Sequence, residues 1–199
     1  MFRVVGFIIG YFVGCINFAY IIGRFKEHID IRDYGSGNSG TTNAIRVMGW
    51  KLGMITFFGD LLKCVLAYVI VANIFDNSIY GLYAGFGAVF GHNWPVFLKF
   101  RGGKGIAATL GLIYAVDWRA GLIVNVVVAI VIFTTKYVSL GSILLVAMMP
   151  VVFYFFKDGN LEYVAVGIIL AVIAIYRHKA NIGRLINGNE NKLGSKKKA

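Results

Sequence analysis

The chain has 199 residues, 58% of them hydrophobic, and its mean hydropathy is +0.73. A soluble globular protein is usually about 45–50% apolar, so this composition excludes an ordinary soluble domain and predicts an all-α polytopic membrane protein. The net charge is +11, from 20 Lys and Arg against 9 Asp and Glu, and no nucleic-acid-binding motif accompanies it. We therefore expect no nucleic acid as a partner.

Seven apolar segments are candidates for transmembrane helices, because a span needs about 20 mainly apolar residues. In chain order they are residues 2–23, 52–73, 79–98, 105–116, 120–135, 138–156 and 163–176. The fourth and fifth are short, so they could form a single hairpin or include a re-entrant piece. We expect residues 1–194 to form one integral-membrane domain and the basic residues 195–199 to form a disordered tail.

The distribution of Lys and Arg predicts the orientation. With the N-terminus outside and seven alternating spans, sixteen cations fall on the inner side, against three outside, Arg3, Arg119 and Lys157. This bias predicts a cytoplasmic C-terminus. The longer polar loops then share the cytoplasmic face, and long loops in a compact protein are usually functional.

The first polar loop, residues 35–46, is rich in Gly, Ser, Thr and Asn and ends at Arg46. Hydroxyl and amide groups on an adaptable backbone suit an oxyanion, and a guanidinium binds phosphate in a bidentate manner. A flexible linker is the alternative that Gly/Ser composition favours.

Residues 91–105, GHNWPVFLKFRGGKG, are the most informative segment of the chain. Glycine exposes backbone N–H groups to a ligand, successive N–H groups form an anion-binding concavity, and Lys104 adds a positive charge. We expect helix to resume at about Ile106, which places a helix N-terminus at the same point and favours phosphate. From this loop alone, a tight turn followed by a basic membrane anchor is equally well supported.

The segment after the last predicted span contains His178, Asn181 and Arg184, which fall on nearly one face if helix continues. Taken alone, this segment is better explained as a basic stretch that binds lipid headgroups. Ser142 lies at the cytoplasmic end of the sixth span, where serine usually makes a cap or a helix contact.

Asp60 and Lys63 lie within the second predicted span, three residues apart. Charges inside a membrane are functional candidates by default, but a structural ion pair is at least as well supported here. Cys15 and Cys64 fall in apolar segments and are interpreted as small core residues. The sequence contains no metal-ligand cluster, so we expect no metal and no cofactor.

Together, the three polar segments resemble the bacterial membrane glycerol-3-phosphate acyltransferases that use acyl phosphate as donor. The resemblance covers nearly the whole chain, and residues 35–43 and 91–105 are similar to the first two motifs of that family. The third motif is matched by His178, Asn181, Arg184, Gly188 and Glu190. Trp94, Arg101 and Thr41 are conservative departures from the family pattern.

The resemblance implies transfer of a fatty acyl group from acyl phosphate to the 1-hydroxyl of sn-glycerol 3-phosphate. The products would be lysophosphatidic acid and inorganic phosphate. It also implies the bacterial cytoplasmic (inner) membrane, an active site on the cytoplasmic side, contact with membrane lipid, and a transient contact with the enzyme that makes acyl phosphate. The alternative from another class is a small transporter of phosphate or organic anions. Transporters tend to have repeats and polar residues near the midplane, whereas polarity here is concentrated in loops.

The expected site residues follow from the two phosphate-bearing substrates. His178 is the first choice for orienting or deprotonating glycerol 3-phosphate and His92 the second, and a substrate phosphate could itself act as the base. Phosphate binding is assigned to Ser36, Arg46, Gly102, Gly103 and Lys104, with Ser142 and Asn181 as supporting donors. The rest of the predicted substrate-binding set is Gly37, Asn38, Thr41 and Asn43.

Overall fold

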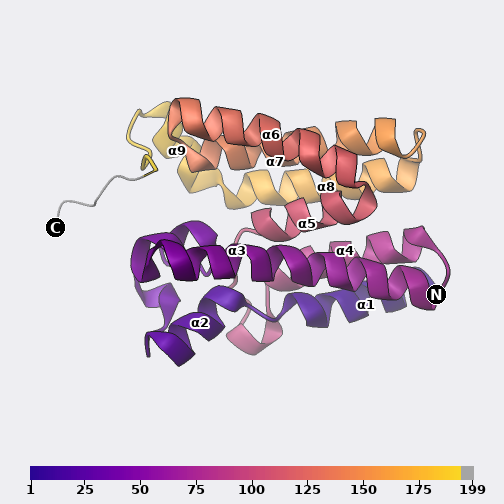
Figure 1. Ribbon diagram of the computed structural model, residues 1–199, viewed down its shortest axis with the longest axis horizontal. Coiled ribbons are helices and arrows are strands. Elements are labelled where there is room, and N and C mark those ends of the chain that lie inside the picture. Colours follow the sequence, from indigo (N-terminus) through magenta and orange to yellow (C-terminus); the bar gives the residue numbers. More distant parts are fainter. Residues whose placement is uncertain (194–199) are drawn as a thin grey trace. The chain divides into compact units, whose positions relative to one another are not determined.

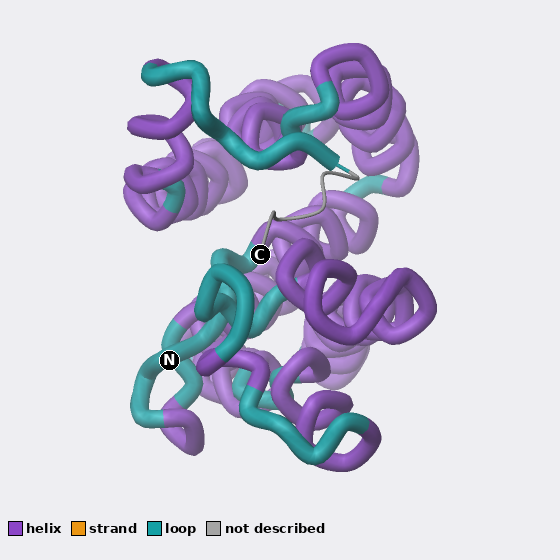
Figure 2. The backbone as a smooth tube through the Cα atoms, turned by 90° about the vertical axis from the view of Figure 1, so that its left-hand side faces the viewer, coloured by secondary structure: helices purple, strands orange, loops and turns teal. Residues whose placement is uncertain are grey.

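The computed structural model of the protein describes residues 1–193, and throughout that range the chain is helix and loop (Figures 1 and 2). The chain divides into two compact units, Met1–Trp118 and Arg119–Ala199. The tail expected at residues 195–199 lies outside the described residues, and the assignment of residues 1–194 to one domain stays a prediction.

The first unit contains five α-helices and two short 3₁₀ turns within the described residues. They are α1 (Phe2–Gly14), α2 (Phe18–Lys26), η1 (Ile31–Asp33), α3 (Thr41–Ile74), α4 (Ser78–Asn93), η2 (Val96–Leu98) and α5 (Ile106–Val116). The predicted segment 2–23 is therefore broken into two helices. Asn17 starts the second one, since its Oδ1 accepts a hydrogen bond from the Tyr20 backbone N–H at 3.0 Å.

Helix α3 is bent near its start. Gly49 has φ 84° and ψ 172°, which is not helical, so a short N-terminal part is set off from the long apolar part. The short part begins at the end of the first polar loop and carries Arg46. The long part coincides with the predicted span 52–73 and carries Asp60 and Lys63.

Glycines let α1 and α4 pack backbone to backbone (Figure 1). Gly6, Gly10 and Gly14 recur every fourth residue, so they share one face of α1. A Cβ at Gly10 would overlap the carbonyl oxygen of Ala84, and one at Gly91 of α4 would overlap that of Tyr11. Small residues at this spacing are what membrane helices use for close approach, and here they fix the position of the C-terminal end of α4.

The second unit contains four helices, α6 (Trp118–Thr135), α7 (Val138–Phe156), α8 (Leu161–Arg177) and α9 (Lys179–Ile186), within the described residues. Helices α7 and α8 pack closely, with Gly167 against the Pro150 backbone and the rings of Phe153 and Tyr163 in an edge-on contact at 6.0 Å. Helix α9 turns away from α8 by 62°.

All seven predicted segments contain helix, but not all are long enough to cross a membrane by themselves. Within the described residues, four stretches meet the requirements of length and composition, and a fifth does if the bent pair α8 and α9 is one span. The four are Phe2–Lys26, Thr41–Ile74, Trp118–Thr135 and Val138–Phe156. Helix α5 has 11 residues and rises about 16 Å, roughly half of the apolar thickness of a bilayer. The count of seven crossings stays a prediction.

Candidate active site

The residues predicted from the sequence divide between the two units. The second unit holds Ser142, His178 and Asn181. The first unit holds the others, Ser36, Gly37, Asn38, Thr41, Asn43, Arg46, His92, Gly102, Gly103 and Lys104.

The glycine loop, defined here as residues 102–105, is closed against the end of α4. Gly102 and Gly103 are buried, Lys104 is half-buried, and the Gly103 N–H donates to the His92 carbonyl at 3.1 Å. Gly105 has φ +78°, and a Cβ there would lie 2.7 Å from Oδ1 of Asn93. Helix α5 begins at Ile106, which confirms the predicted restart of the helix and places its N-terminus at the loop.

The turn before the glycine loop is strained. Lys99 and Phe100 both have left-handed backbone angles, φ 54° and 58°. Non-glycine residues in this region cost about 1–3 kcal/mol each and persist only where the surroundings fix them. Two hydrogen bonds do so, from Phe100 N–H to the Pro95 carbonyl at 3.0 Å and from Arg101 N–H to the Leu98 carbonyl at 3.2 Å. The loop therefore has one defined shape.

The first polar loop is also fixed, which argues against the flexible-linker alternative. Asn43 is buried; its Oδ1 accepts from the Ser36 N–H at 2.8 Å, and its Nδ2 donates to the carbonyls of Ile31 and Tyr34 at 3.2 and 3.0 Å. Both amide N–H groups are thus bonded to the chain just before the loop. Asn43 shapes the loop, and its predicted contact with substrate stays a prediction.

Two residues that the sequence analysis missed hold this loop as well. Asn17 donates from Nδ2 to the carbonyl and the Oγ of Ser39, at 3.2 and 3.1 Å, and both residues are buried. Twenty-two residues separate the partners, so no local pattern indicates the contact. Asn17 therefore ties the break between α1 and α2 to the Gly/Ser-rich loop.

Arg32 lies in η1, just before the first polar loop, and connects that turn to the turn before the glycine loop. Its Nη1 donates to the Leu98 carbonyl at 2.9 Å, while Nε and Nη2 bind the two carboxylate oxygens of Asp30 at 2.9 and 2.7 Å. The hydrogen bonds from Arg32 outweigh the effect of partial burial and lower the pKa of Asp30 to about 2. The sequence analysis missed both residues, because their role depends on a contact across 66 positions.

Several residues predicted to bind a ligand lie at the surface of the first polar loop. Ser36, Gly37 and Arg46 are exposed, and Asn38 is half-buried, with Nδ2 at 3.4 Å from the Ser36 hydroxyl oxygen. Thr41 is the first residue of α3, and its Oγ1 is buried without a hydrogen-bond partner in the part of the chain that the structure describes.

A buried polar cluster lies beneath the glycine loop. Lys63 Nζ is 2.7 Å from Oδ1 of Asp60, so the predicted ion pair between these residues is confirmed. The same Nζ lies 3.0 Å from Nδ1 of His92 and 2.6 Å from the Ile16 carbonyl. These three side chains are no more than 4% exposed. The cluster thus joins α3, the end of α4 and the break after α1.

His178 stands at the corner between α8 and α9, and it is 3% exposed. Its Nδ1 lies 2.7 Å from the Ala174 carbonyl oxygen. Because a carbonyl only accepts, Nδ1 must carry the proton, and the neutral ring then has its lone pair on Nε2. That is the form of histidine that can take up a proton.

Glu190 organises the remaining residues of the C-terminal motif. Gly188, with φ +68°, reverses the chain after α9. Glu190 then accepts from Asn181 Nδ2 at 2.8 Å and from Arg184 Nε at 2.6 Å. Partial burial raises its pKa, but the hydrogen bonds from these two residues outweigh it and leave the pKa lowered. Asn181 and Arg184 therefore share a face, and one N–H of the Asn181 amide is committed to Glu190.

Ser142 is buried, and its hydroxyl donates to the Val138 carbonyl at 2.9 Å. It could donate to a ligand only by exchanging that bond. Within residues 1–193, no three His, Cys, Asp or Glu side chains are grouped so as to hold a metal ion. The expectation of no metal stays a prediction.

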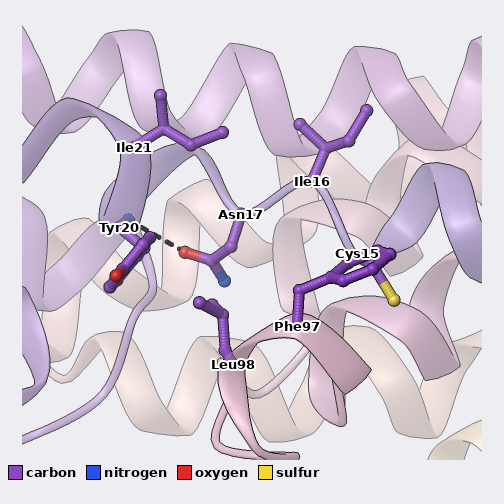
Figure 3. A pocket seen from close by; sticks show the side chains of 7 residues that line it. All are labelled: Cys15, Ile16, Asn17, Tyr20, Ile21, Phe97 and Leu98. Carbon is purple, nitrogen blue, oxygen red and sulfur yellow. Dashed lines mark hydrogen bonds between the residues drawn. The ribbon is translucent and has the colours of Figure 1, made fainter. Parts of the chain in front are cut away.

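A small recess opens at the break between α1 and α2 (Figure 3). Its volume is about 260 Å³, and Asn17 supplies its amide in an otherwise mainly apolar lining. In Figure 3 that amide is held by the hydrogen bond to the Tyr20 backbone N–H. The lining suits hydrocarbon better than phosphate. It consists of Cys15, Ile16, Asn17, Tyr20, Ile21, Phe97 and Leu98.

The long apolar helices define a helical protein of the membrane-spanning class, and an ordered glycine loop that contains Lys104 precedes α5. A sequence model of the glycerol-3-phosphate acyltransferase family matches residues 4–188. Proteins of that name from Thermoanaerobacter sp. (strain X514) and Clostridioides difficile (strain 630) are 45% and 41% identical to this chain. The alignments cover 98% of both chains for the first, and 96% of this chain and 95% of the relative for the second.

The chain is also similar to crystal structures of PlsY, an integral membrane glycerol 3-phosphate acyltransferase. Its glycerol 3-phosphate form gives a TM-score of 0.88 and 34% identity over 96% of both chains. Its lysophosphatidic acid form gives a TM-score of 0.85 over 96% of this chain and 95% of the other. The chain belongs to the glycerol-3-phosphate acyltransferase family.

Proposed function

We propose that this protein transfers a fatty acyl group from acyl phosphate to the 1-hydroxyl of sn-glycerol 3-phosphate, releasing lysophosphatidic acid and inorganic phosphate. Membership of the family carries the acceptor and the reaction type. The crystal forms of PlsY with glycerol 3-phosphate and with lysophosphatidic acid support this acceptor and this product.

The donor is proposed from the resemblance to the acyl-phosphate-dependent enzymes, and the chemistry of the loops supports it. Acyl phosphate is a mixed anhydride with a good leaving group, so the protein needs mainly to position the alcohol and stabilise negative charge. The glycine loop offers backbone N–H groups, Lys104 and the N-terminus of α5, which together suit a small phosphate head. Arg46 and Ser36, exposed at the first polar loop, supply further donors. Asn181 and Ser142 are supporting donors.

His178 is the proposed base. The hydrogen bond from Nδ1 to the Ala174 carbonyl leaves the Nε2 lone pair to accept the proton of the 1-hydroxyl. The hydroxyl oxygen then bonds to the acyl carbon, and the bond from that carbon to the phosphate oxygen breaks. Phosphate leaves with the electron pair of that bond, and the proton passes from His178 to phosphate or water.

The proposal includes a location in the bacterial cytoplasmic membrane with the N-terminus outside and the C-terminus and active site on the cytoplasmic side. Five and seven crossings are both odd and place the termini on opposite sides. The test places one cysteine at Asp158 and another at Lys192 in a Cys15→Ala/Cys64→Ala background. A membrane-impermeant thiol reagent added to intact cells should label position 158 alone, and labelling of position 192 would reverse the proposed orientation.

The reaction itself is tested by giving purified protein in lipid vesicles sn-glycerol 3-phosphate with one of three donors: acyl phosphate, acyl-CoA or acyl carrier protein. Acyl phosphate should give lysophosphatidic acid with one phosphate released per product molecule, and the other donors should serve poorly. Comparable rates with acyl-CoA, or product without matching phosphate, would refute the donor assignment. Transport of phosphate without any ester product would favour the transporter alternative.

A further inference from the structure

The recess at the break between α1 and α2 lies within the apolar part of a span. The stretch Phe2–Lys26 has the length and composition of one transmembrane span although its helix is broken. Ile16 and Ile21 line the recess on the side of the break, and Phe97 lines it from η2, as Figure 3 shows. All three side chains are exposed. In a bilayer this surface meets hydrocarbon, and about 260 Å³ is room for part of one acyl chain.

The hydrogen bonds of the polar groups in this lining are directed away from the recess, to the neighbouring chain. Asn17 accepts from the Tyr20 backbone N–H at 3.0 Å and donates to the carbonyl and the hydroxyl oxygen of Ser39 at 3.2 and 3.1 Å. The Leu98 carbonyl accepts from Arg32 at 2.9 Å. A polar ligand would have to compete with these bonds, whereas a hydrocarbon chain leaves them intact.

A guanidinium that is only partly neutralised lies beside the recess. Arg24 follows Tyr20 by one helical turn; its guanidinium carbon is 5.5 Å from the Tyr20 ring centroid, and its Nε is 3.3 Å from the hydroxyl. Asp30 accepts from Arg32 with both carboxylate oxygens, at 2.9 and 2.7 Å, but makes one contact of 3.4 Å to Arg24. The Arg24 side chain is 48% exposed, so it can bind a further anion.

The cation and the recess lie at the depths of two parts of one molecule. Arg24 is in the last turn of α2, at the end of the span, where cations meet lipid headgroups. Tyr20 of the recess precedes it by four residues and lies about 6 Å deeper. Free phosphate would use the cation alone and a neutral lipid the recess alone, whereas an anionic phospholipid would use both.

We propose that the recess and Arg24 form a binding site for an anionic phospholipid of the bilayer, with one acyl chain in the recess and the headgroup phosphate at Arg24. The chain packs against Asn17, which holds Ser39 of the first polar loop, and against Leu98, which binds Arg32. The lipid therefore steadies the two polar loops as well. Acyl phosphate and lysophosphatidic acid have the same two parts, but the lining contains no residue of the glycine loop or the first polar loop.

Photolabelling tests the site on full-length protein in phosphatidylcholine nanodiscs. A small fraction of the lipid is replaced by phosphatidylglycerol, or by phosphatidylcholine, with a diazirine in one acyl chain, and labelled peptides are identified by mass spectrometry. The phosphatidylglycerol probe should label peptides containing residues 15–21 and 96–98 about fivefold more than the phosphatidylcholine probe, the effect of one cation near the membrane surface. Equal labelling by the two probes overturns the proposal.

Variants separate the two parts of the site. Arg24→Gln should remove the preference for phosphatidylglycerol, and Arg24→Lys should keep part of it. Lys26→Gln is the matched control, because it removes an exposed cation from the same end of α2. Ile21→Trp fills the recess and should reduce labelling by both probes. The proposal fails if Lys26→Gln loses the preference as fully as Arg24→Gln, or if labelling is unchanged in Ile21→Trp.

Competition and kinetics decide between the lipid and the substrates. Excess acyl phosphate or lysophosphatidic acid should leave the phosphatidylglycerol labelling unchanged, and displacement by either would assign the recess to that molecule and overturn the proposal. Phosphatidylglycerol should raise the rate of the wild-type protein and of Lys26→Gln, but not that of Arg24→Gln. Equal wild-type rates with and without it would overturn the link to the loops. Labelling by the two probes requires no turnover, so its failure is distinct from failure of the proposed function.

Discussion

His92 in the first unit and His178 in the second are equally buried, at 3% exposure, but their Nδ1 atoms have opposite kinds of partner. Nδ1 of His178 faces a carbonyl oxygen that can only accept. Nδ1 of His92 faces the ammonium of Lys63, which can only donate. In the neutral rings, Nε2 therefore has a lone pair in His178 and an N–H in His92.

The groups around the two histidines differ in the same way as the partners of their Nδ1 atoms. The surroundings of His92 supply donors, namely loop N–H groups, Lys104 and the N-terminus of α5, and together they suit negative charge. Around His178 the structure supplies a ring positioned by the bend between α8 and α9, and a neighbouring Asn181 held by Glu190. Burial alone does not distinguish the two histidines, whereas the partner of Nδ1 indicates whether Nε2 of the neutral ring can donate or accept.

The largest expected effect tests the proton-accepting side of the comparison. His178→Asn should lower kcat by about 10²- to 10⁴-fold with little change in either KM, because loss of general-base catalysis removes a contribution of that size. Steady-state assays with acyl phosphate measure it. His28→Asn, the same change at an exposed loop histidine, is the matched control. A fall of less than tenfold in His178→Asn would leave a substrate phosphate as the base.

The next effect concerns the donor side. Lys104→Met and Arg46→Gln should each reduce kcat/KM by roughly 30- to 1,000-fold, since a charge-assisted bond to phosphate is worth about 2–4 kcal/mol in a site of this kind. The protein should remain folded in membranes, as judged by its elution in detergent. Lys99→Met makes the same change as Lys104→Met, and Lys51→Gln likewise replaces a cation by glutamine; both positions are exposed, and both variants should have near-normal kinetics. Near-normal turnover in Lys104→Met and Arg46→Gln would refute the phosphate-binding role.

A smaller effect is expected at Glu190. Glu190→Gln removes the charge that Asn181 and Arg184 bind, and it should destabilise the turn after α9 by about 1–2 kcal/mol. The effect is kept modest because the Arg184 side chain is 38% exposed and water screens this pair. Hydrogen exchange of residues 179–191 measures the loss, with Glu27→Gln as control. Since the folded-state pKa of Glu190 is lowered, its contribution is present above the ordinary value of 4.5 and is lost as the pH falls below it. Equal protection in Glu190→Gln and the wild-type protein at neutral pH would show that the carboxylate does not hold this turn.

Much of the architecture follows from the sequence. Composition predicts helices in a membrane, and the segment 138–156 coincides with α7. The glycine run before Ile106 predicts the start of α5, because few other residues allow φ +78° and so close an approach to Asn93. Local chemistry of this kind depends on neighbours in the chain.

What could not be predicted depends on distant contacts. The break at residues 15–17 is stabilised by Ser39 and Lys63, so periodicity alone gave one segment instead of α1 and α2. The pairing of Asp60 with Lys63 follows from their spacing, but the third partner, His92, is 29 residues further on. The different partners of the two Nδ1 atoms could not be predicted, since the sequence alone does not place Ala174 or Lys63 at a ring nitrogen.

The smallest expected effect tests whether the shape of the glycine loop and of the turn before it depends on the contacts of Arg32. Asp30→Asn removes the carboxylate that holds Arg32, which in turn binds the Leu98 carbonyl beside the glycine loop. Exchange of loop amides in residues 30–43 and 98–103 should become faster by an amount equivalent to about 0.2–1 kcal/mol, the range for ion pairs near the surface. The side chains of Arg32 and Asp30 are 16% and 10% exposed. The pKa of Asp30 is about 2 in the folded protein, against an ordinary 3.8. Its contribution is therefore fully present above pH 3.8 and lost as the pH falls through 2. The ratio of exchange rates in Asp30→Asn and wild-type protein should approach one over that interval.

Asp33→Asn, the same change at an exposed carboxylate in the same turn, should leave these amides as they are at every pH. A ratio for Asp30→Asn that does not change between pH 5 and pH 2 would mean that the carboxylate charge does not hold Arg32, and that the two loops are joined by other contacts.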